Sequence, residues 1–512
     1  MTLLKTSRLD ASRRRFLRTA SVVSGSVGSA AVPFALNLAS LNTAVAQTAD
    51  YKAIVCLFFY GGNDSSHMVL RTDALSFNEY TRLRSVAPES IALKAPGTAV
   101  VAGAALASPD RLGGARAIVP KFTAGLAGSA ENSAFTYALH PSMPEVATLF
   151  AANRLAILAN AGPLVQPLTR AEYVANVKPR PKALGSHNDQ QSTWQALGPE
   201  GAKIGWGGHL GDLVASSNSN TVFTSISVSG NAVFSAGETV FQYQVGSGGA
   251  TQIGGLSGTL FGSTTAAASL KSIVTANNQH LFANEYGAIV KRSVDAQAAF
   301  QTAYVASTVT APTQYVQPST GNSVNNGLAA QLQTVARIIG ARAGLGAKRQ
   351  VFFVSMGGFD THDGQNMNQA DLLARISHAL AYFDTTLAGM AGGDMRNSVT
   401  LFTASDFGRT LTSNGDGTDH GWGAHHFVRG GAVTGGDLYG NFPVLGAKNV
   451  KDNNFDSSPN QIGNGSLIPE TSVDQLGATL AKWFGVSASD ALMVFPNLAN
   501  FDVAKRDLGF MA

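Results

Sequence analysis

The sequence contains one cysteine and few charged residues, which excludes internal disulfides and a disordered chain. Its one cysteine, Cys56, cannot form an internal disulfide, so the 512-residue chain depends on its core for stability. Charged residues make up only 13% of the chain against 45% hydrophobic residues, which excludes a disordered protein and favours a compact globule. No segment is apolar over the length that a membrane-spanning helix needs, so no stable membrane span is expected.

Outside its N-terminus, the chain has no excess of basic over acidic residues. Six of the 36 basic residues and one of the 32 acidic residues lie in residues 1–46, which leaves 30 basic against 31 acidic residues in the remainder. The formal charge of +4 therefore comes from the N-terminus. This balance provides no electrostatic footprint for nucleic acid, and no nucleic-acid partner is expected.

The N-terminus is typical of an export signal. Residues 12–18 read Ser-Arg-Arg-Arg-Phe-Leu-Arg, which matches the twin-arginine pattern. A weakly apolar stretch follows up to about residue 41, and residues 44–46, Ala-Val-Ala, suit a cleavage site. The alternative, a basic arm on an amphipathic helix, does not account for this combination of parts. We expect residues 1–46 to be a signal peptide that engages the twin-arginine translocase and delivers the protein to the periplasm or outside the cell.

Apolar strands and amphipathic helices alternate along most of the chain. Strands are predicted over residues 53–60, 155–159, 350–355 and 398–403, and helices over 144–154, 328–343, 370–390 and 473–484. This alternation predicts an α/β fold with a doubly wound, mostly parallel sheet and helices on both faces, formed by residues 47–512. Residues 216–326 are rich in Ser, Thr, Gly, Asn, Gln and Ala, and we predict that they form an insertion.

Acidic and imidazole side chains gather between residues 357 and 426. Five of the ten histidines lie in this window of 70 residues. Ligands bind outside the carboxyl ends of the strands in such a sheet, so acids that follow strands should meet on one rim. Imidazole and carboxylate groups are the ligands that zinc and its first-row neighbours prefer. The candidate metal ligands are Asp64, Asp360, His362, Asp406, His420 and His425, with His426 beside them.

Two of these acids have a simpler interpretation. Asp64 lies in a Gly-Gly-Asn-Asp turn and Asp406 in a Ser-Asp-Phe-Gly turn, and aspartate is common in turns and at helix caps. The recurrence of an acid after three strands of one fold is what favours a metal site over three separate caps.

Several short motifs resemble those of the domain of unknown function 1501 family, which comprises exported bacterial proteins of the alkaline-phosphatase-like superfamily. The matching segments cover nearly all of the mature chain: residues 59–64, 140–144, 186–194, 357–362, 405–409, 419–421 and 467–469. The resemblance implies an alkaline-phosphatase-like fold and the hydrolysis of phosphate or sulfate esters with one or two divalent ions. Zinc, manganese, magnesium and calcium all remain open.

The resemblance also implies roles for individual residues. Asp64 and Asp406 would bind one ion, Asp360, His362 and His420 the other, and Ser186 would be the nucleophile. Ser186 precedes a predicted helix, where it could equally be an N-cap. Arg409, which ends the motif at 405–409, is the second candidate catalytic residue. The Cys/Ser-x-Pro-x-Arg signature of sulfatases is absent around Ser186, which argues against a formylglycine sulfatase.

Two functions are the main candidates from the sequence, and a third, an exported carbohydrate-modifying enzyme, is supported only by aromatic and polar loops. The first is an exported metal-dependent hydrolase that acts on a small-molecule or polymer-borne anionic ester. The alternative is an exported binding or assembly protein that keeps the hydrolase fold with a reduced metal site. Phe407 favours the alternative, because the superfamily usually has a histidine at that position.

Overall fold

The computed structural model describes residues 51–126, 128–446 and 458–512. They belong to one compact unit, Ala44–Ala512. The predicted signal peptide, residues 1–46, lies outside the described residues. In the part of the chain that is described, no helix is both long and apolar enough to cross a membrane.

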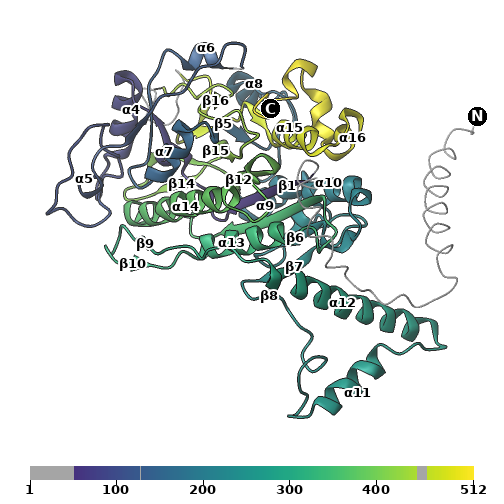
Figure 1. Ribbon diagram of the computed structural model, residues 1–512. Coiled ribbons are helices and arrows are strands. Elements are labelled where there is room, and N and C mark those ends of the chain that lie inside the picture. The colour runs from purple at the N-terminus through teal and green to yellow at the C-terminus, as the bar shows by residue number, and fades with distance from the viewer. Residues whose placement is uncertain (1–50, 127, 447–457) are drawn as a thin grey trace, which may run out of the picture. The chain divides into compact units, whose positions relative to one another are not determined.

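A ten-stranded mixed sheet forms the centre of the fold (Figure 1). Its middle consists of β11 (Arg349–Met356), β1 (Lys52–Phe59) and β12 (Val399–Ser405), which run parallel to one another. The sheet runs from β16 (Leu438–Tyr439) through β5 (Leu155–Gly162), β15 (Ala424–Arg429), β12, β1, β11, β6 (Ser225–Ser227) and β7 (Tyr243–Gly246) to β8 (Gly249–Ala250). β19 (Thr471–Ser472) also pairs with β5. The pairs β12–β15, β15–β5 and β7–β8 are antiparallel.

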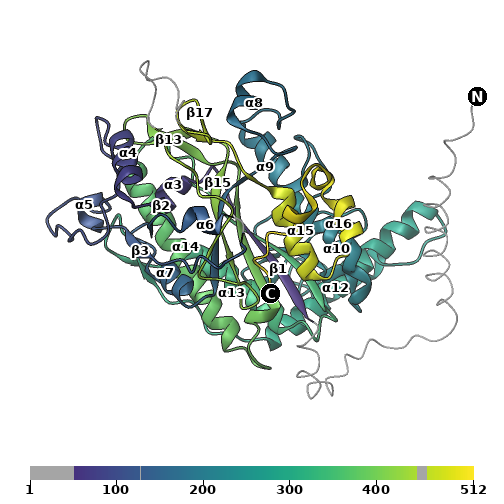
Figure 2. The same ribbon diagram turned by 90° about the horizontal axis from the view of Figure 1, so that it is seen from above.

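Helices cover both faces of this sheet because β1 is apolar on both sides. Ala53, Val55 and Leu57 pack into one core cluster, and Ile54, Cys56 and Phe58 pack into another. The first cluster includes α7 (Pro144–Ala151), α13 (Gly327–Gly340) and α14 (Gln365–Ala388). The second includes α10 (Trp206–Val214), α15 (Val473–Phe484) and α16 (Ala488–Val494), and Figure 2 shows α15, α16 and α10 together beside β1. The predicted α/β fold with helices on both faces of a mostly parallel sheet is therefore confirmed.

The range 216–326, predicted to be an insertion, contains both sheet and helix. β6 (Ser225–Ser227) pairs with β11, β7 (Tyr243–Gly246) pairs with β6, and β8 (Gly249–Ala250) ends this side of the sheet. Two helices follow, α11 (Thr264–Val274) and α12 (Leu281–Ala306), and then the short strands β9 (Tyr315–Val316) and β10 (Ser323–Val324). The first part of the range is thus built into the central sheet.

The middle of the sheet also positions the candidate site. Parallel pairing of β11, β1 and β12 brings their carboxyl ends, at Met356, Phe59 and Ser405, to the same edge. The segments that follow these strands carry Asp360 and Asp406. Residues separated by hundreds of positions in the sequence therefore lie side by side.

Candidate metal centre

The loop after β1 joins the loop after β12. The backbone N–H of Gly61 donates to Oδ2 of Asp406 at 3.1 Å, and the N–H of Asn63 donates to Oγ of Ser405 at 2.9 Å. Gly61 has a φ of +117°, and a Cβ there would lie 2.4 Å from the backbone nitrogen of Asp360. A glycine is therefore needed at this position, where the loop after β1 passes close to the backbone of Asp360.

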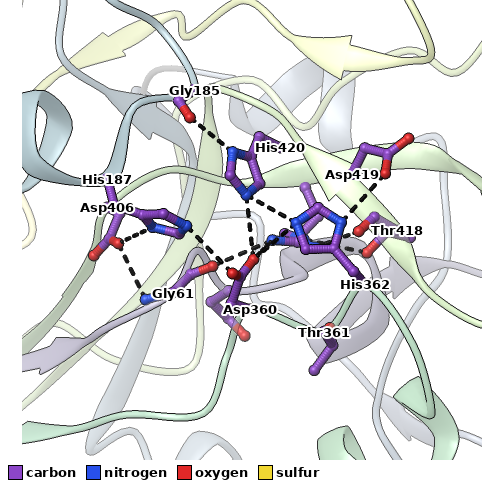
Figure 3. Close-up of polar contacts among 12 residues, drawn as sticks. Gly61, Gly185, His187, Asp360, Thr361, His362, Asp406, Thr418, Asp419 and His420 are labelled. Atoms are coloured by element: carbon purple, nitrogen blue, oxygen red, sulfur yellow. Dashed lines mark hydrogen bonds and ion pairs between the residues drawn. The ribbon is translucent and has the colours of Figure 1, made fainter.

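Asp360 lies at the centre of a cluster of polar side chains (Figure 3). Nη1 of Arg409 donates to its Oδ1 at 2.7 Å, and Nε2 of His420 lies 3.2 Å from the same oxygen. Burial raises the pKa of Asp360, but hydrogen bonds and charge from Arg409, with contributions from His420 and His362, more than offset this, so the net pKa is lowered. The carboxylate is therefore kept ionised, as a metal ligand must be.

His420, on β14 (Thr418–His420), points one ring nitrogen toward Asp360 and the other away from it. Nδ1 lies 2.7 Å from the carbonyl oxygen of Gly185. A carbonyl only accepts hydrogen bonds, so Nδ1 carries the proton and Nε2 carries a lone pair. Burial lowers the pKa of His420, with a further decrease from Arg409, and this favours the neutral ring.

His187 joins the cluster from the other side, at the first residue of α9 (His187–Ala196). Its Nδ1 lies 2.6 Å from Oδ2 of Asp406, and its Nε2 lies 3.4 Å from Oδ2 of Asp360. Asp406 is fully buried, and burial raises its pKa, although hydrogen bonds from Gln191, His187 and Gly61 partly offset the increase. His187 therefore lies between two carboxylates (Figure 3).

His362 borders the cluster on its solvent side. Nε2 of His362 lies 3.0 Å from Nε2 of His420 and 3.1 Å from Oδ1 of Asp360. Its Nδ1 lies 3.3 Å from Oδ1 of Asp419. The side chain is 45% exposed, compared with 26% for His420.

These positions define a group that could hold a metal ion. One ligand atom each of His187, Asp360 and His420 lies within 4.8 Å of the others, and this is the one such group of His, Cys, Asp or Glu side chains in the described residues. Asp360, His362 and His420 were all predicted from the sequence as metal ligands, and Asp360 and His420 belong to this group. His187 was not predicted, although the residue follows the nucleophile candidate Ser186 directly.

Asp64, predicted as a ligand, has other partners. Nη1 of Arg84 donates to its Oδ2 at 2.6 Å and Nη2 donates to its Oδ1 at 3.0 Å, with both side chains at most 1% exposed. Nε2 of Gln365 donates to Oδ2 at 2.6 Å, and Oδ1 accepts from the N–H of His67, which caps a short helix, α3 (Ser65–Met68). The structure thus places Asp64 in a buried ion pair rather than with His187 and Asp360.

His425, also predicted as a ligand, lies within the sheet. Both His425 and His426 are on β15 (Ala424–Arg429), not in a loop, and both are about 1% exposed. Nδ1 of His425 accepts from the N–H of Asn160 at 3.1 Å, and its ring stacks on Phe442 at 4.2 Å. Burial lowers the pKa of each histidine to about 3, so both rings are neutral parts of the core.

The two candidate catalytic residues differ in accessibility. Oγ of Ser186 donates to Oδ2 of Asp189 at 2.8 Å, and Ser186 is half-buried between Gly185 and His187. The side chain of Arg409 is fully buried and also donates to the carbonyl oxygens of Gly61 and Thr418. Arg409 therefore acts on Asp360 and does not face a substrate.

Phe407 packs against the imidazoles instead of adding a ligand. Its ring centroid lies 4.9 Å from that of His187 and 4.5 Å from that of His420, and the side chain is 1% exposed. The ring restricts the movement of both histidines and excludes water from one side of the cluster.

Together, the fold and the cluster define an α/β protein with a candidate metal centre at the carboxyl edge of its sheet. The family described as "Protein of unknown function (DUF1501)" matches residues 51–455, and the chain belongs to this family. No curated protein matches the sequence.

Solved structures resemble the chain only distantly. Ps i-CgsB, in complex with k-i-k-neocarrahexaose, is 10% identical with a TM-score of 0.30, and 72% of each chain is covered. The PsFucS1 sulfatase from Pseudoalteromonas sp. is 8% identical with a TM-score of 0.32, covering 90% of this chain and 73% of the other. Similarities at this level carry no information about the reaction.

Proposed function

We propose that the protein is a metal-dependent hydrolase of phosphate, sulfate or related anionic esters. The observation that supports the proposal is the gathering of imidazole nitrogens around the carboxylate of Asp360. Nε2 of His420 and Nε2 of His362 lie 3.0 Å apart. Nδ1 of His420 faces the carbonyl oxygen of Gly185, so in the neutral ring its Nε2 carries a lone pair, whereas both ring nitrogens of His362 face carboxylate oxygens.

A divalent cation would satisfy the lone pair of His420 and the negative charge of Asp360 together. Asp360 adds its carboxylate oxygens next to the same two nitrogens, at 3.2 Å from His420 and 3.1 Å from His362. Neutral imidazole and ionised carboxylate are the donors that divalent first-row ions prefer. The residues therefore fit a divalent ion by their chemistry.

In this setting a bound divalent ion would polarise an ester oxygen and favour deprotonation of the attacking group. Ser186 is the candidate nucleophile, because it lies between Gly185 and His187, whose polar atoms both contact the cluster. The amino-terminal end of α9 begins at the same place, and its partial positive charge favours a negatively charged substrate. Arg409 keeps Asp360 ionised and oriented.

We also propose, from the sequence, that the protein is exported through the twin-arginine translocase. Export of a folded protein is compatible with a metal ion bound before translocation. Periplasmic or extracellular esters, either small molecules or attached to polymers, are then the accessible substrates.

The direct test combines metal analysis with an ester-hydrolysis panel. We expect the purified protein to contain a divalent ion and to hydrolyse at least one phosphomonoester, phosphodiester or sulfate ester. The variant Asp360→Asn should lose both the ion and turnover while keeping the wild-type circular dichroism spectrum. His280→Gln, a change to an exposed histidine at the start of α12, is the matched control and should keep both. Full turnover by Asp360→Asn would refute the proposal.

A further inference from the structure

We infer that the site binds one ion rather than two, through His187, His420 and Asp360, and that Asp406 positions His187 instead of binding an ion. The inference rests on the proposed metal dependence and makes it more specific. It is carried by the contacts of His187, by the partners of Asp406 and Asp64, and by the type of the donor atoms.

His187 is held in the same way as His420. Nδ1 of His187 lies 2.6 Å from Oδ2 of Asp406, which also accepts from Gly61 and Gln191. Nδ1 is therefore the donor, and in the neutral ring Nε2 carries a lone pair 3.4 Å from Oδ2 of Asp360. Nδ1 of His420 donates to Gly185 O while its Nε2 faces the other oxygen of Asp360. In the neutral rings, the unprotonated nitrogens of both imidazoles therefore face one carboxylate. An oxygen atom that accepts a hydrogen bond from the other ring nitrogen orients each imidazole. Ligating histidines are usually held by such an outer hydrogen bond.

Asp406 has the surroundings of an outer partner. Its Oδ2 accepts from three donors: the N–H of Gly61 at 3.1 Å, Nε2 of Gln191 at 3.0 Å, and Nδ1 of His187. The side chain is fully buried. Three donors share this oxygen, and through His187 Asp406 would influence the ion without touching it.

Asp64 is the carboxylate at which a second ion would be expected, but it is already paired with the guanidinium of Arg84. Asp64 follows β1 just as Asp360 follows β11, but Arg84 forms two charge-assisted hydrogen bonds with it, and Gln365 forms another. Both charged side chains are buried, so the positive charge of Arg84 is needed there. An ion beside Asp64 would have to compete with this guanidinium.

The donor types indicate which ion is preferred. Two imidazole nitrogens and one carboxylate suit zinc or a neighbouring first-row ion, whereas magnesium and calcium prefer sites made of oxygen atoms. Three protein ligands are also the usual number in catalytic zinc sites, where a further position is left for water or substrate. His362 borders this open side of the cluster.

The inference is tested by metal titration of the whole protein, without measuring hydrolysis. Bound metal is removed with a chelator, and Zn²⁺ is then titrated against a chromophoric competitor. We expect one ion per chain, with tighter binding of Zn²⁺ than of Mg²⁺ or Ca²⁺. His187→Ala should weaken Zn²⁺ binding by more than 100-fold, because it removes a ligand.

Asp406→Asn should weaken binding by about 10–100-fold and leave the stoichiometry at one, as expected for an outer partner. The amide oxygen can still accept from His187, but the negative charge is lost. His280→Gln serves as the control for exposed histidines and should bind Zn²⁺ like the wild type. Circular dichroism and thermal unfolding show whether each variant is folded.

Several results would overturn the inference. These are two ions per chain, wild-type affinity in His187→Ala, or loss of one of two ions in Asp406→Asn. A protein that binds one Zn²⁺ as described but hydrolyses no ester would leave this inference intact and refute the hydrolase proposal. The two failures are therefore distinguishable.

Discussion

Nδ1 of His187 lies 2.6 Å from Oδ2 of Asp406, across a separation of 219 residues in the sequence. This contact connects the start of α9 to the end of β12 and turns the free nitrogen of His187 toward Asp360. A buried carboxylate behind an imidazole is a common way to orient a metal-binding histidine. The relationship explains why a chain with Phe407 beside Asp406 still presents two imidazoles to one carboxylate.

Ser186→Ala tests the nucleophile. If Ser186 attacks the ester, turnover should fall on the order of 1000-fold or more while the metal content stays at the wild-type level. Steady-state kinetics and metal analysis on the same preparation measure both quantities. Ser192→Ala, on the same helix with its hydroxyl bonded to Pro199 O, is the matched control. Unchanged turnover in Ser186→Ala would assign the attack to water and leave Ser186 as a residue at the start of α9.

Gly61→Ala tests the close approach of the strand ends. A Cβ at Gly61 would meet the backbone of Asp360 at 2.4 Å, so the loop that carries Asp360 must move. We expect loss of bound metal, measured by metal analysis, together with a lower thermal midpoint. Gly201→Ala is the control, because Gly201 also has a positive φ, +86°, but no atom within 4 Å of the added Cβ. That change should cost about 1 kcal/mol of backbone strain and keep the metal.

Arg84→Met tests the buried ion pair. Removal of the guanidinium leaves Asp64 charged and buried. We therefore expect the free energy of unfolding to fall by about 3–5 kcal/mol. Urea denaturation measures the change. Arg82→Met, on the same helix α4 (Ala74–Arg84), removes a pair with Glu79 in which Arg82 is 50% exposed, and should cost less than about 1 kcal/mol. Equal effects of the two substitutions would contradict the role given to burial.

Asp474→Asn tests a pH dependence of stability away from the site. Burial raises the pKa of Asp474 from 3.8 to about 6, although hydrogen bonds from Asn497 partly offset the increase. In the unfolded chain the carboxyl loses its proton near pH 4, so the folded state binds more protons between about pH 4 and 6. The contribution of Asp474 to the stability of the wild type should therefore fall through this range as the pH rises.

The asparagine variant should lack this loss. The difference in unfolding free energy between variant and wild type should grow from pH 4 to 6 and level off above it, reaching at most about 3 kcal/mol. Urea denaturation at a series of pH values measures it. Asp295→Asn, a change to a 60% exposed carboxylate, is the control. A difference that shrinks with rising pH would contradict the assignment.

The order of the central elements could be predicted from the sequence. β1 is apolar after Lys52 and β11 and β12 are mostly apolar, as a strand covered on both faces requires. α14 and α15 show the apolar stripe of a helix packed on a sheet. Asp360 was recognisable because acids that follow parallel strands meet at one edge, and His362 and His420 because histidines are dense in the same window of the sequence.

Other parts of the site could not be read in this way. His425 stands in a glycine-rich stretch that suggested a loop, but pairing of β15 with β5 buries it. Asp64 follows a strand like Asp360, and no local feature indicates that Arg84, 20 residues later, takes up its charge. In the sequence, the only indication that His187 belongs to the site is the neighbouring candidate nucleophile, Ser186.

The sequence by itself therefore determined which residue types are present and which strands carry them to the edge of the sheet. Only the tertiary structure decided which carboxylate faces a histidine and which faces an arginine. The physical reason is that hydrophobic periodicity is local and repeats along the chain, whereas the partner of a buried charge is set by packing between distant segments. His187 and Asp406, 219 residues apart, are the pair for which this distinction matters most.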